Sequence, residues 1–416
     1  MKSSIRIKSI SIEECWILCL LVVNTSFFHL VSISDLSGIT VPDLEVIICC
    51  VFGFLVYLKY GFSPAKGLFS RISLFTVILV FYGAIIPHIL FGQDLLRGFT
   101  SQRILLVGYL SYFPLYVAFT KGRLTREKII KIVCLVGIIE AIVVTAQCLM
   151  MGKFSFTTLS MEWDSRDGGH RLRIFGYPIL FAFFYWLEAI IKGTKRKGKL
   201  LGAVLTLVVF FFFVRIRMLI MGISAIIVIS ILTVKTKNQR KIFFILLITA
   251  VMIAALHFNV FDFAFSAIKS LSNITDFRTI GRKYFLEAII KRPMLGYGFP
   301  NINCLEAINA AGENYGIYIV DNGLFGFTYM YGLIGLAWWM IAYIYPLSVS
   351  NKCNGLWAEK MLLLFQIIII ASLVYIIQDV TWCLMNTVVF CIFNATNEES
   401  KKNEICTSIN TYIESV

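Results

Sequence analysis

Charged side chains are scarce in this chain of 416 residues, and the scarcity limits what the protein can be. Asp, Glu, Lys and Arg together make up 15% of the residues, whereas hydrophobic residues make up 58%. An average soluble domain has about 25% charged and about 45–50% apolar residues. With a mean hydropathy of +0.82, the sequence excludes an ordinary soluble domain. It predicts an all-α polytopic integral membrane protein in which residues 1–416 form a single transmembrane domain.

Clusters of histidine and cysteine, the usual ligands of structural and catalytic metals, are also missing. The chain has 4 His and 11 Cys, with no CxxC pair and no His/Cys group at metal-ligand spacing. Most of the cysteines fall inside apolar runs, and only Cys304 lies in a segment that is predicted to be external. This excludes an external disulfide framework, and the sequence predicts neither a metal nor a cofactor.

Long apolar runs, by contrast, are abundant. A transmembrane helix needs about 20 predominantly apolar residues. By this criterion the sequence predicts about twelve helices, near residues 15–33, 44–60, 73–91, 104–119, 129–151, 174–191, 199–214, 217–234, 242–258, 322–347, 361–378 and 380–394. The first is interpreted as a retained helix, because no convincing small-residue cleavage site follows it. Two external loops, at about 152–173 and 259–321, are long enough to build a site.

Basic residues outnumber acidic ones, and their positions orient the chain. The chain has 38 Lys and Arg against 24 Asp and Glu, a formal net charge of +14. Short cytoplasmic loops of membrane proteins carry an excess of Lys and Arg. With both termini in the cytoplasm, 24 of the 38 basic residues fall on that side. The positive charge therefore reflects topology, and nucleic acid is not expected as a partner.

The two sides of the predicted membrane differ in the kind of basic residue that they carry. The cytoplasmic side has 18 Lys and 6 Arg, whereas the external side has 4 Lys and 10 Arg. The external arginines are Arg97, Arg103, Arg166, Arg171, Arg173, Arg215, Arg217, Arg278, Arg282 and Arg292. External carboxylates such as Asp43 and Asp94 are the alternative partners for some of them. Because the planar fork of Arg suits phosphate better than Lys does, the enrichment predicts an anionic ligand outside.

The segment Gly281–Arg292 has the pattern of an amphipathic helix at the membrane surface. One side carries apolar residues and the other carries charged residues, and Pro293 is expected to end the helix. The apolar side consists of Phe285, Leu286, Ala288, Ile289 and Ile290. A second such helix is predicted near residues 260–271.

Four motifs follow one another between residues 281 and 336. They are Gly281-Arg282-x(5)-Ala288, Pro293-x-x-Gly296-x-Gly298, the polar pair Asp321-Asn322 and a helix with Gly332-x-x-Gly335. In this order they resemble the bacterial O-antigen polymerase and O-antigen ligase superfamily. The stretch Arg171–Pro178 and the Arg215–Arg217 turn also resemble parts of that superfamily. Ligases carry a His-Asn pair where this chain has Asp321-Asn322, so the chain resembles the polymerase (Wzy-type) branch.

The resemblance implies a reaction and a location. A polymerase of this kind lies in the bacterial cytoplasmic (inner) membrane. It transfers a growing glycan from undecaprenyl diphosphate to a carrier-linked repeat unit on the outer face of that membrane. The implied partners are the undecaprenyl-diphosphate-linked oligosaccharide, membrane lipids and a chain-length-determinant protein.

For that reaction the sequence offers a base and a set of cations. Asp321 is the candidate general base for the acceptor hydroxyl, although the Asp-Asn pair also fits a helix N-cap. Arg282, Arg215 and Arg217 are the candidates to stabilise charge on the leaving diphosphate, since no metal ligands are apparent. Candidates for binding diphosphate or glycan are Arg171, Arg173, Arg278, Arg292, Trp163 and Tyr297. The two aromatic rings would alternatively anchor the chain at the membrane interface.

Two other functions are compatible with the sequence. An O-antigen ligase shares the fold and the donor but transfers polysaccharide to a lipid acceptor. A polysaccharide flippase or secondary transporter also commonly has twelve helices, but such proteins place ionisable groups at mid-membrane. Here Glu140 is the clearest such group, and we expect it to be buried against a hydrogen-bonding partner rather than to relay protons.

Overall fold

The structure is a computed structural model that is built mainly of helices. It describes residues 10–32, 39–62, 67–150, 155–159, 161–164, 169–172, 174, 176–193, 196–214, 216–234, 237–238, 240–242, 245–246, 249, 277–350, 356–370 and 380–396. Most of the predicted helix near 242–258 and all of the predicted helix near 260–271 lie outside these residues.

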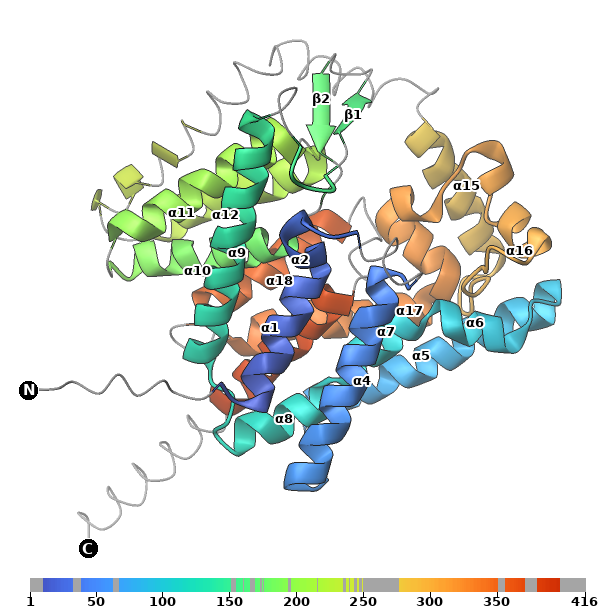
Figure 1. Cartoon of the computed structure of the whole chain (residues 1–416). Helices are drawn as coiled ribbons and strands as arrows, with labels where there is room; N and C mark the ends of the chain where they lie inside the picture. Colours follow the sequence, from blue (N-terminus) through green and yellow to red (C-terminus); the bar gives the residue numbers. More distant parts are fainter. Residues whose placement is uncertain are drawn as a thin grey trace, which may run out of the picture.

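The first half of the described chain consists of eight helices and a short hairpin (Figure 1). The helices are α1 (Ile12–Asn24), α2 (Ser26–His29), α4 (Val41–Tyr60), α5 (Leu68–Phe91), α6 (Leu95–Ser101), α7 (Arg103–Leu110), α8 (Tyr112–Thr120) and α9 (Arg126–Leu149). The antiparallel hairpin of β1 (Met161–Asp164) and β2 (Gly169–Leu172) follows and lies inside the first predicted external loop.

The second half returns to helices. They are α10 (Tyr177–Ile191), α11 (Arg196–Val208), the π-helical segment η1 (Val209–Val214), α12 (Arg217–Thr233), α15 (Phe277–Lys291), α16 (Leu305–Ala310), the short segments η2 (Glu313–Tyr315) and η3 (Ile319–Asn322), α17 (Gly323–Ser350) and α18 (Trp357–Ile370). A last apolar helix spans Val380–Thr396.

Within the described residues, six segments are long and apolar enough to cross a membrane. They are Val41–Tyr60, Leu68–Phe91, Arg103–Thr120, Arg126–Leu149, Lys197–Val214 and Ile319–Ser348. Shorter apolar helices span Tyr177–Ile191, Leu219–Thr233 and Val380–Thr396. The predicted class, a helical multi-pass membrane protein, is therefore confirmed. The count of twelve helices and their orientation stay predictions.

A cluster of charges around two buried carboxylates joins three helices at one end of the bundle. Arg126, at the start of α9, forms ion pairs with Glu188 near the end of α10 and with Glu359 near the start of α18, where Nε and Oε1 are 2.7 Å apart. Lys192 pairs with Glu188 at 2.5 Å. Because two cations face two carboxylates, the buried charge is neutralised within the cluster, as buried ions require.

A second polar cluster joins the end of α1 to the start of α4 and to Thr381. Asn24 Nδ2 donates to Glu45 Oε1 at 3.0 Å, and the Thr381 hydroxyl donates to the same oxygen. The start of α1 is tied to the start of α9 instead, where Lys128 pairs with Glu14 at 2.6 Å. Helices α1 and α4 therefore run in opposite directions, and both lie beside other long helices (Figure 1).

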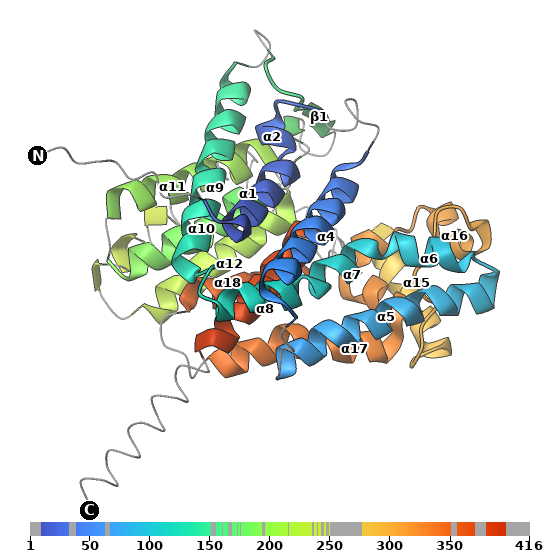
Figure 2. The same cartoon turned by 60° about the horizontal axis from the view of Figure 1, so that its bottom comes forward.

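Helices α5 and α17 pack side by side (Figure 2), and both contain a break in their hydrogen bonding. Pro87 lies inside α5. Its nitrogen carries no hydrogen, so the carbonyl of Gly83 four residues earlier loses its partner within the helix. The N–H of Phe299, from the chain that follows α15, donates to this carbonyl at 2.8 Å.

The same part of the chain also fills the break in α17. The break is at Gly332, whose φ of 61° and ψ of −163° are not helical. The Tyr329 carbonyl accepts from Tyr297 N–H at 2.9 Å, and Leu333 N–H donates to the Pro293 carbonyl at 2.8 Å. We call residues 293–299 the bridging loop, because its main chain satisfies polar groups of two interrupted membrane helices.

Gly298 in the bridging loop has no room for a side chain. Its φ is +77°, and a Cβ built there would collide with the ring of Pro87. Its N–H donates to the Met330 carbonyl at 2.8 Å. The second glycine of the Pro293-x-x-Gly296-x-Gly298 motif therefore has a physical reason, namely close contact between the loop and α5.

We expect Gly298→Ala to lower the melting temperature of the detergent-solubilised protein more than Gly61→Ala does. Gly61 has nearly the same φ, +74°, but nothing lies within 4 Å of its built Cβ. Because Gly61 has a ψ of 171°, Gly61→Ala tests only the cost of a positive φ in a region that glycine alone readily adopts, about 1–3 kcal/mol, whereas Gly298→Ala adds the collision with Pro87. Equal changes in melting temperature would contradict the contact between the bridging loop and α5.

Candidate functional site

Helix α15 brings the first of the four motifs against the third. A Cβ added to Gly281 would lie only 2.7 Å from both Oδ1 and Nδ2 of Asn322, so the backbone of α15 lies directly on this side chain. The ring of Phe285 is fully buried, with its centroid 5.0 Å from that of Tyr329 in α17. The Gly281-Arg282 and Asp321-Asn322 pairs, which are 40 residues apart in the chain, are therefore neighbours in space.

The predicted amphipathic helix is confirmed as a helix and ends before Pro293, as expected. Its apolar side, however, does not face one environment. Phe285 faces the protein, whereas Leu286 and Ile290 are 46% and 69% exposed. Part of the face that was expected to lie on the membrane surface is thus used to dock α15 on α17.

Two tyrosines fix the segment after α16 against this pair of helices. Tyr284 OH of α15 and Tyr329 OH of α17 both donate to the carbonyl of Ala310, at 2.9 and 2.7 Å. A tyrosine hydroxyl is protonated at neutral pH, and burial raises the pKa of Tyr284 further, so it remains a donor. The shared acceptor holds α15, α16 and α17 as one unit around Asp321.

Asp321 and Arg282 lie at this junction without being paired to each other. Both side chains are half-buried, and no ion pair joins either of them to another residue in the described part of the chain. Since neither group has an ion-pair partner among the described residues, the guanidinium remains available to an anionic ligand.

Asn322 contributes more than its place beside Asp321 suggested. Its side chain is 2% exposed, and its Nδ2 donates back to the Tyr318 carbonyl at 2.8 Å instead of capping α17. Its Oδ1 is buried with no hydrogen-bond partner among the described residues. A buried polar atom of this kind is costly and is most often found where a ligand or a function requires it.

Arg292 and Tyr297 meet just after α15. The Arg292 guanidinium lies 5.7 Å from the centroid of the Tyr297 ring, a cation–π contact. The other partner of this ring is Tyr329, which stacks on it at 4.8 Å with an interplanar angle of 8°. Tyr297 thus anchors the bridging loop and supports Arg292, in addition to its predicted role toward glycan.

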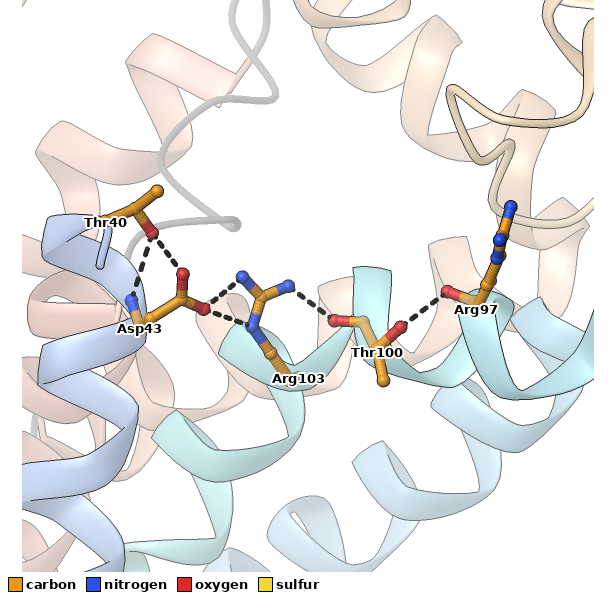
Figure 3. A network of polar contacts seen from close by, with 5 residues as sticks. All are labelled: Thr40, Asp43, Arg97, Thr100 and Arg103. Atoms are coloured by element: carbon orange, nitrogen blue, oxygen red, sulfur yellow. Dashed lines mark hydrogen bonds and ion pairs between the residues drawn. The ribbon is translucent and has the colours of Figure 1, made fainter. Parts of the chain in front are cut away.

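Among the external arginines, Arg103 has a carboxylate partner. Its Nε donates to Asp43 Oδ1 at 2.8 Å and its Nη1 to the Thr100 carbonyl at 2.7 Å. Figure 3 shows this chain of contacts, with the Arg97 guanidinium directed away from it. For Arg103 the alternative stated for the external arginines, pairing with Asp43, is therefore correct. Within the described side chains, Arg97, Arg282 and Arg292 form no ion pair.

The remaining predicted site residues belong to a second group, around the hairpin. Strand β2 carries Arg171, opposite Glu162 in the register, and it contacts η1, which ends just before the Arg215–Arg217 turn. The backbone thus brings the two arginine-bearing segments near each other. Arg173 and Arg215 lie outside the described residues, as do the side chains of Trp163, Arg171, Arg217 and Arg278.

Helical spacing alone would have identified the docking face of α15. Gly281, Tyr284, Phe285 and Ala288 recur at i, i+3, i+4 and i+7, which is one face of a helix. This face carries the contacts with Asn322, Ala310 and Tyr329. The motif-based prediction selected Arg282, which lies next to this face.

Comparison with known proteins adds no relative. No family model, no curated protein and no solved structure matches this chain. The likeness to the O-antigen polymerase and ligase superfamily rests on the order of the motifs.

The shared acceptor predicts a non-additive response to removal of the two tyrosine hydroxyls. Tyr284→Phe or Tyr329→Phe alone leaves the Ala310 carbonyl one donor, so each costs about 1 kcal/mol. The double variant leaves the Ala310 carbonyl without either tyrosine donor. The decrease in melting temperature of the double variant in detergent should therefore exceed the sum of the two single decreases. Strict additivity would show that the two hydroxyls do not share this acceptor.

Proposed function

We propose that this protein is a glycan polymerase of the bacterial cytoplasmic membrane. In this proposal it transfers a growing polysaccharide from a lipid diphosphate carrier, undecaprenyl diphosphate, to a carrier-linked repeat unit at the outer face. The observation that carries the proposal is the contact between Gly281 and Asn322. It brings the turn of α15 that carries Arg282, which has no ion-pair partner among the described residues, against the Asp321–Asn322 segment.

The chemistry needs one base and fixed positive charge. A hydroxyl oxygen of the acceptor sugar attacks the anomeric carbon of the donor glycan, the bond from that carbon to the diphosphate oxygen breaks, and the hydroxyl proton moves to Asp321. Negative charge grows on the departing diphosphate, and the guanidinium of Arg282 is the described group best situated to stabilise it. Asn322 supports the position of Asp321 through its contact with α15.

The pattern of arginine pairing supports an anionic ligand. Arg103 is engaged by Asp43 and serves the fold, whereas Arg282 and Arg292 have no carboxylate partner among the described residues. Arginines left unpaired at one end of a membrane protein are suited to a bidentate ligand such as a diphosphate. Arg171 and the Arg215–Arg217 turn would supply further charge from the hairpin side.

A transporter mechanism finds less support. Glu140 is 1% exposed, and its Oε1 lies 3.3 Å from His29 Nε2. The carboxylate therefore has a hydrogen-bonding partner, as expected from the sequence. Reconstitution of the purified protein in liposomes with carrier-linked repeat units separates the two classes, because elongation of the glycan supports the proposal and translocation without elongation contradicts it.

We expect Arg282→Ala to abolish long-chain polysaccharide while the protein level is kept. Loss of one transition-state donor typically costs about 10²–10³-fold in rate. Arg103→Ala is the matched control, since it removes an external arginine whose partner is Asp43. The glycan ladder of that variant should change only in proportion to its protein level. A full-length ladder from Arg282→Ala would contradict the role of this residue toward the diphosphate.

Asp321→Asn tests the base without changing the shape of the side chain. Loss of general base catalysis should lower polymerisation in liposomes by about 10²–10⁴-fold, with little change in melting temperature. Glu287→Gln, which neutralises an exposed carboxylate on α15, should retain activity. Normal chain length in Asp321→Asn would mean that Asp321 serves only the local structure.

A further inference from the structure

A polar cleft lies apart from the Asp321 junction, where the end of α5, the first turn of α6 and residues 301–306 meet. Its volume is about 260 Å³, and six of its lining residues are Phe91, Asp94, Arg97, Asn303, Cys304 and Glu306. Sites for drug-sized ligands are larger, about 300–1,000 Å³. The cleft is therefore of a size for one small polar unit.

The floor of the cleft is held in place by two buried side-chain amides that are hydrogen-bonded to the main chain. Gln93 is 1% exposed; its Nε2 donates to the Phe299 carbonyl at 3.1 Å, and its Oε1 accepts from Asn301 N–H at 2.8 Å. Asn301 donates in turn to the Arg97 carbonyl at 3.2 Å and accepts from Asn303 N–H at 2.8 Å. A preformed wall of this kind lowers the cost of ordering the site when a ligand binds.

The rim of the cleft carries hydrogen-bonding groups of both kinds. Arg97 and Asn303 supply donors, while Asp94, Glu306 and the Asn303 oxygen supply acceptors. All four side chains are exposed, and Figure 3 shows the Arg97 guanidinium directed away from the Asp43–Arg103 pair. Two carboxylates against one guanidinium give the cleft a net negative charge, which disfavours phosphate and other anions.

We propose that this cleft binds one uncharged sugar unit of a glycan. Sugar hydroxyls both donate and accept hydrogen bonds, so they require the mixture of groups that the rim provides. The net charge separates this cleft from Arg282 and Arg292, which suit the diphosphate. That the sugar belongs to the acceptor glycan rests on the proposed function; that the cleft binds sugar does not.

The bridging loop connects the cleft with the candidate site. Arg292 precedes the bridging loop. The last residue of the loop, Phe299, accepts a hydrogen bond from Gln93 in the floor of the cleft. Because the loop is fixed to α5 and α17 by main-chain hydrogen bonds, the spacing between the two positions is set by the fold.

Cys304 gives a direct test, because its thiol lines the cleft. Purified full-length protein in nanodiscs is labelled with a charged maleimide, and the rate for Cys304→Ser is subtracted as background. The probes are free hexoses, N-acetylhexosamines and the oligosaccharide released by mild acid from the cell's own polysaccharide, with inorganic phosphate and pyrophosphate as anion comparators. Binding of the same radiolabelled oligosaccharide is measured in parallel.

We expect a sugar probe at ten times its Kd to slow labelling of Cys304 by about tenfold, by mass action, and phosphate or pyrophosphate to have no effect. Glu306→Gln and Asn303→Ala should reduce this protection and weaken oligosaccharide binding. Glu287→Gln, an exposed carboxylate away from the cleft, should retain both. The readout is the ratio of rates with and without sugar, because Glu306 Oε2 lies 3.7 Å from the Cys304 sulfur and can change the basal rate.

Several outcomes would overturn the inference, and they differ from those that overturn the proposed function. If no sugar protects Cys304 and none binds, or if phosphate protects equally well, the cleft is not a sugar site. Retained protection in both Glu306→Gln and Asn303→Ala would also exclude it. Protection by sugars in a protein that elongates no glycan would leave the cleft as a sugar site and remove the polymerase. Elongation of glycan without protection of Cys304 would support the polymerase and exclude the cleft as a sugar site.

Discussion

The need to satisfy buried main-chain polar groups organises this structure. Pro87 leaves the Gly83 carbonyl of α5 without its helical partner, and the break at Gly332 frees the Tyr329 carbonyl of α17. Both residues are buried in the protein, so neither carbonyl can turn to water. Main-chain N–H groups of the bridging loop reach both, and this requirement fixes the loop between the two helices. The bridging loop thus connects the two helices at their interruptions.

Both candidate sites depend on this attachment of the bridging loop to α5 and α17. The loop connects the end of α15 to the segment that carries Asn301, so its position determines where α15 and the floor of the cleft lie. The pairing of Tyr284 and Tyr329 at Ala310 then closes the unit around α17. At each interruption the freed group has a defined hydrogen-bond partner in the loop. Defined attachment of this kind is what a site needs to hold a base and a cation at fixed positions.

The sequence predicted those parts of the molecule that depend on local composition. Apolar length indicated the membrane segments, helical spacing indicated α15, and the helix-breaking effect of proline placed the end of α15 before Pro293. Motif order suggested that Arg282 and Asp321 belong together, and the contact of Gly281 with Asn322 agrees with this. The hydrogen bond from Phe299 N–H to the Gly83 carbonyl joins residues 216 positions apart. The sequence could not predict it, because any main-chain N–H can donate to a carbonyl that lacks its helical partner. The partner of Arg103 was equally open, since several external carboxylates had the right charge.

The external arginines, whose excess over lysine the sequence showed, differ in their local surroundings. An excess of external Arg suggested anion binding for all of them, but the described arginines serve different ends. Arg103 stabilises the packing of α4 on α7 through Asp43, Arg292 lies over Tyr297, and Arg97 lies among carboxylates that outnumber it. The local balance of charge, rather than the residue type, therefore decides what each arginine can bind. The proposed transfer would use such a division, because a uniformly positive surface would attract a diphosphate to both places, whereas a locally negative cleft leaves room for uncharged sugar units.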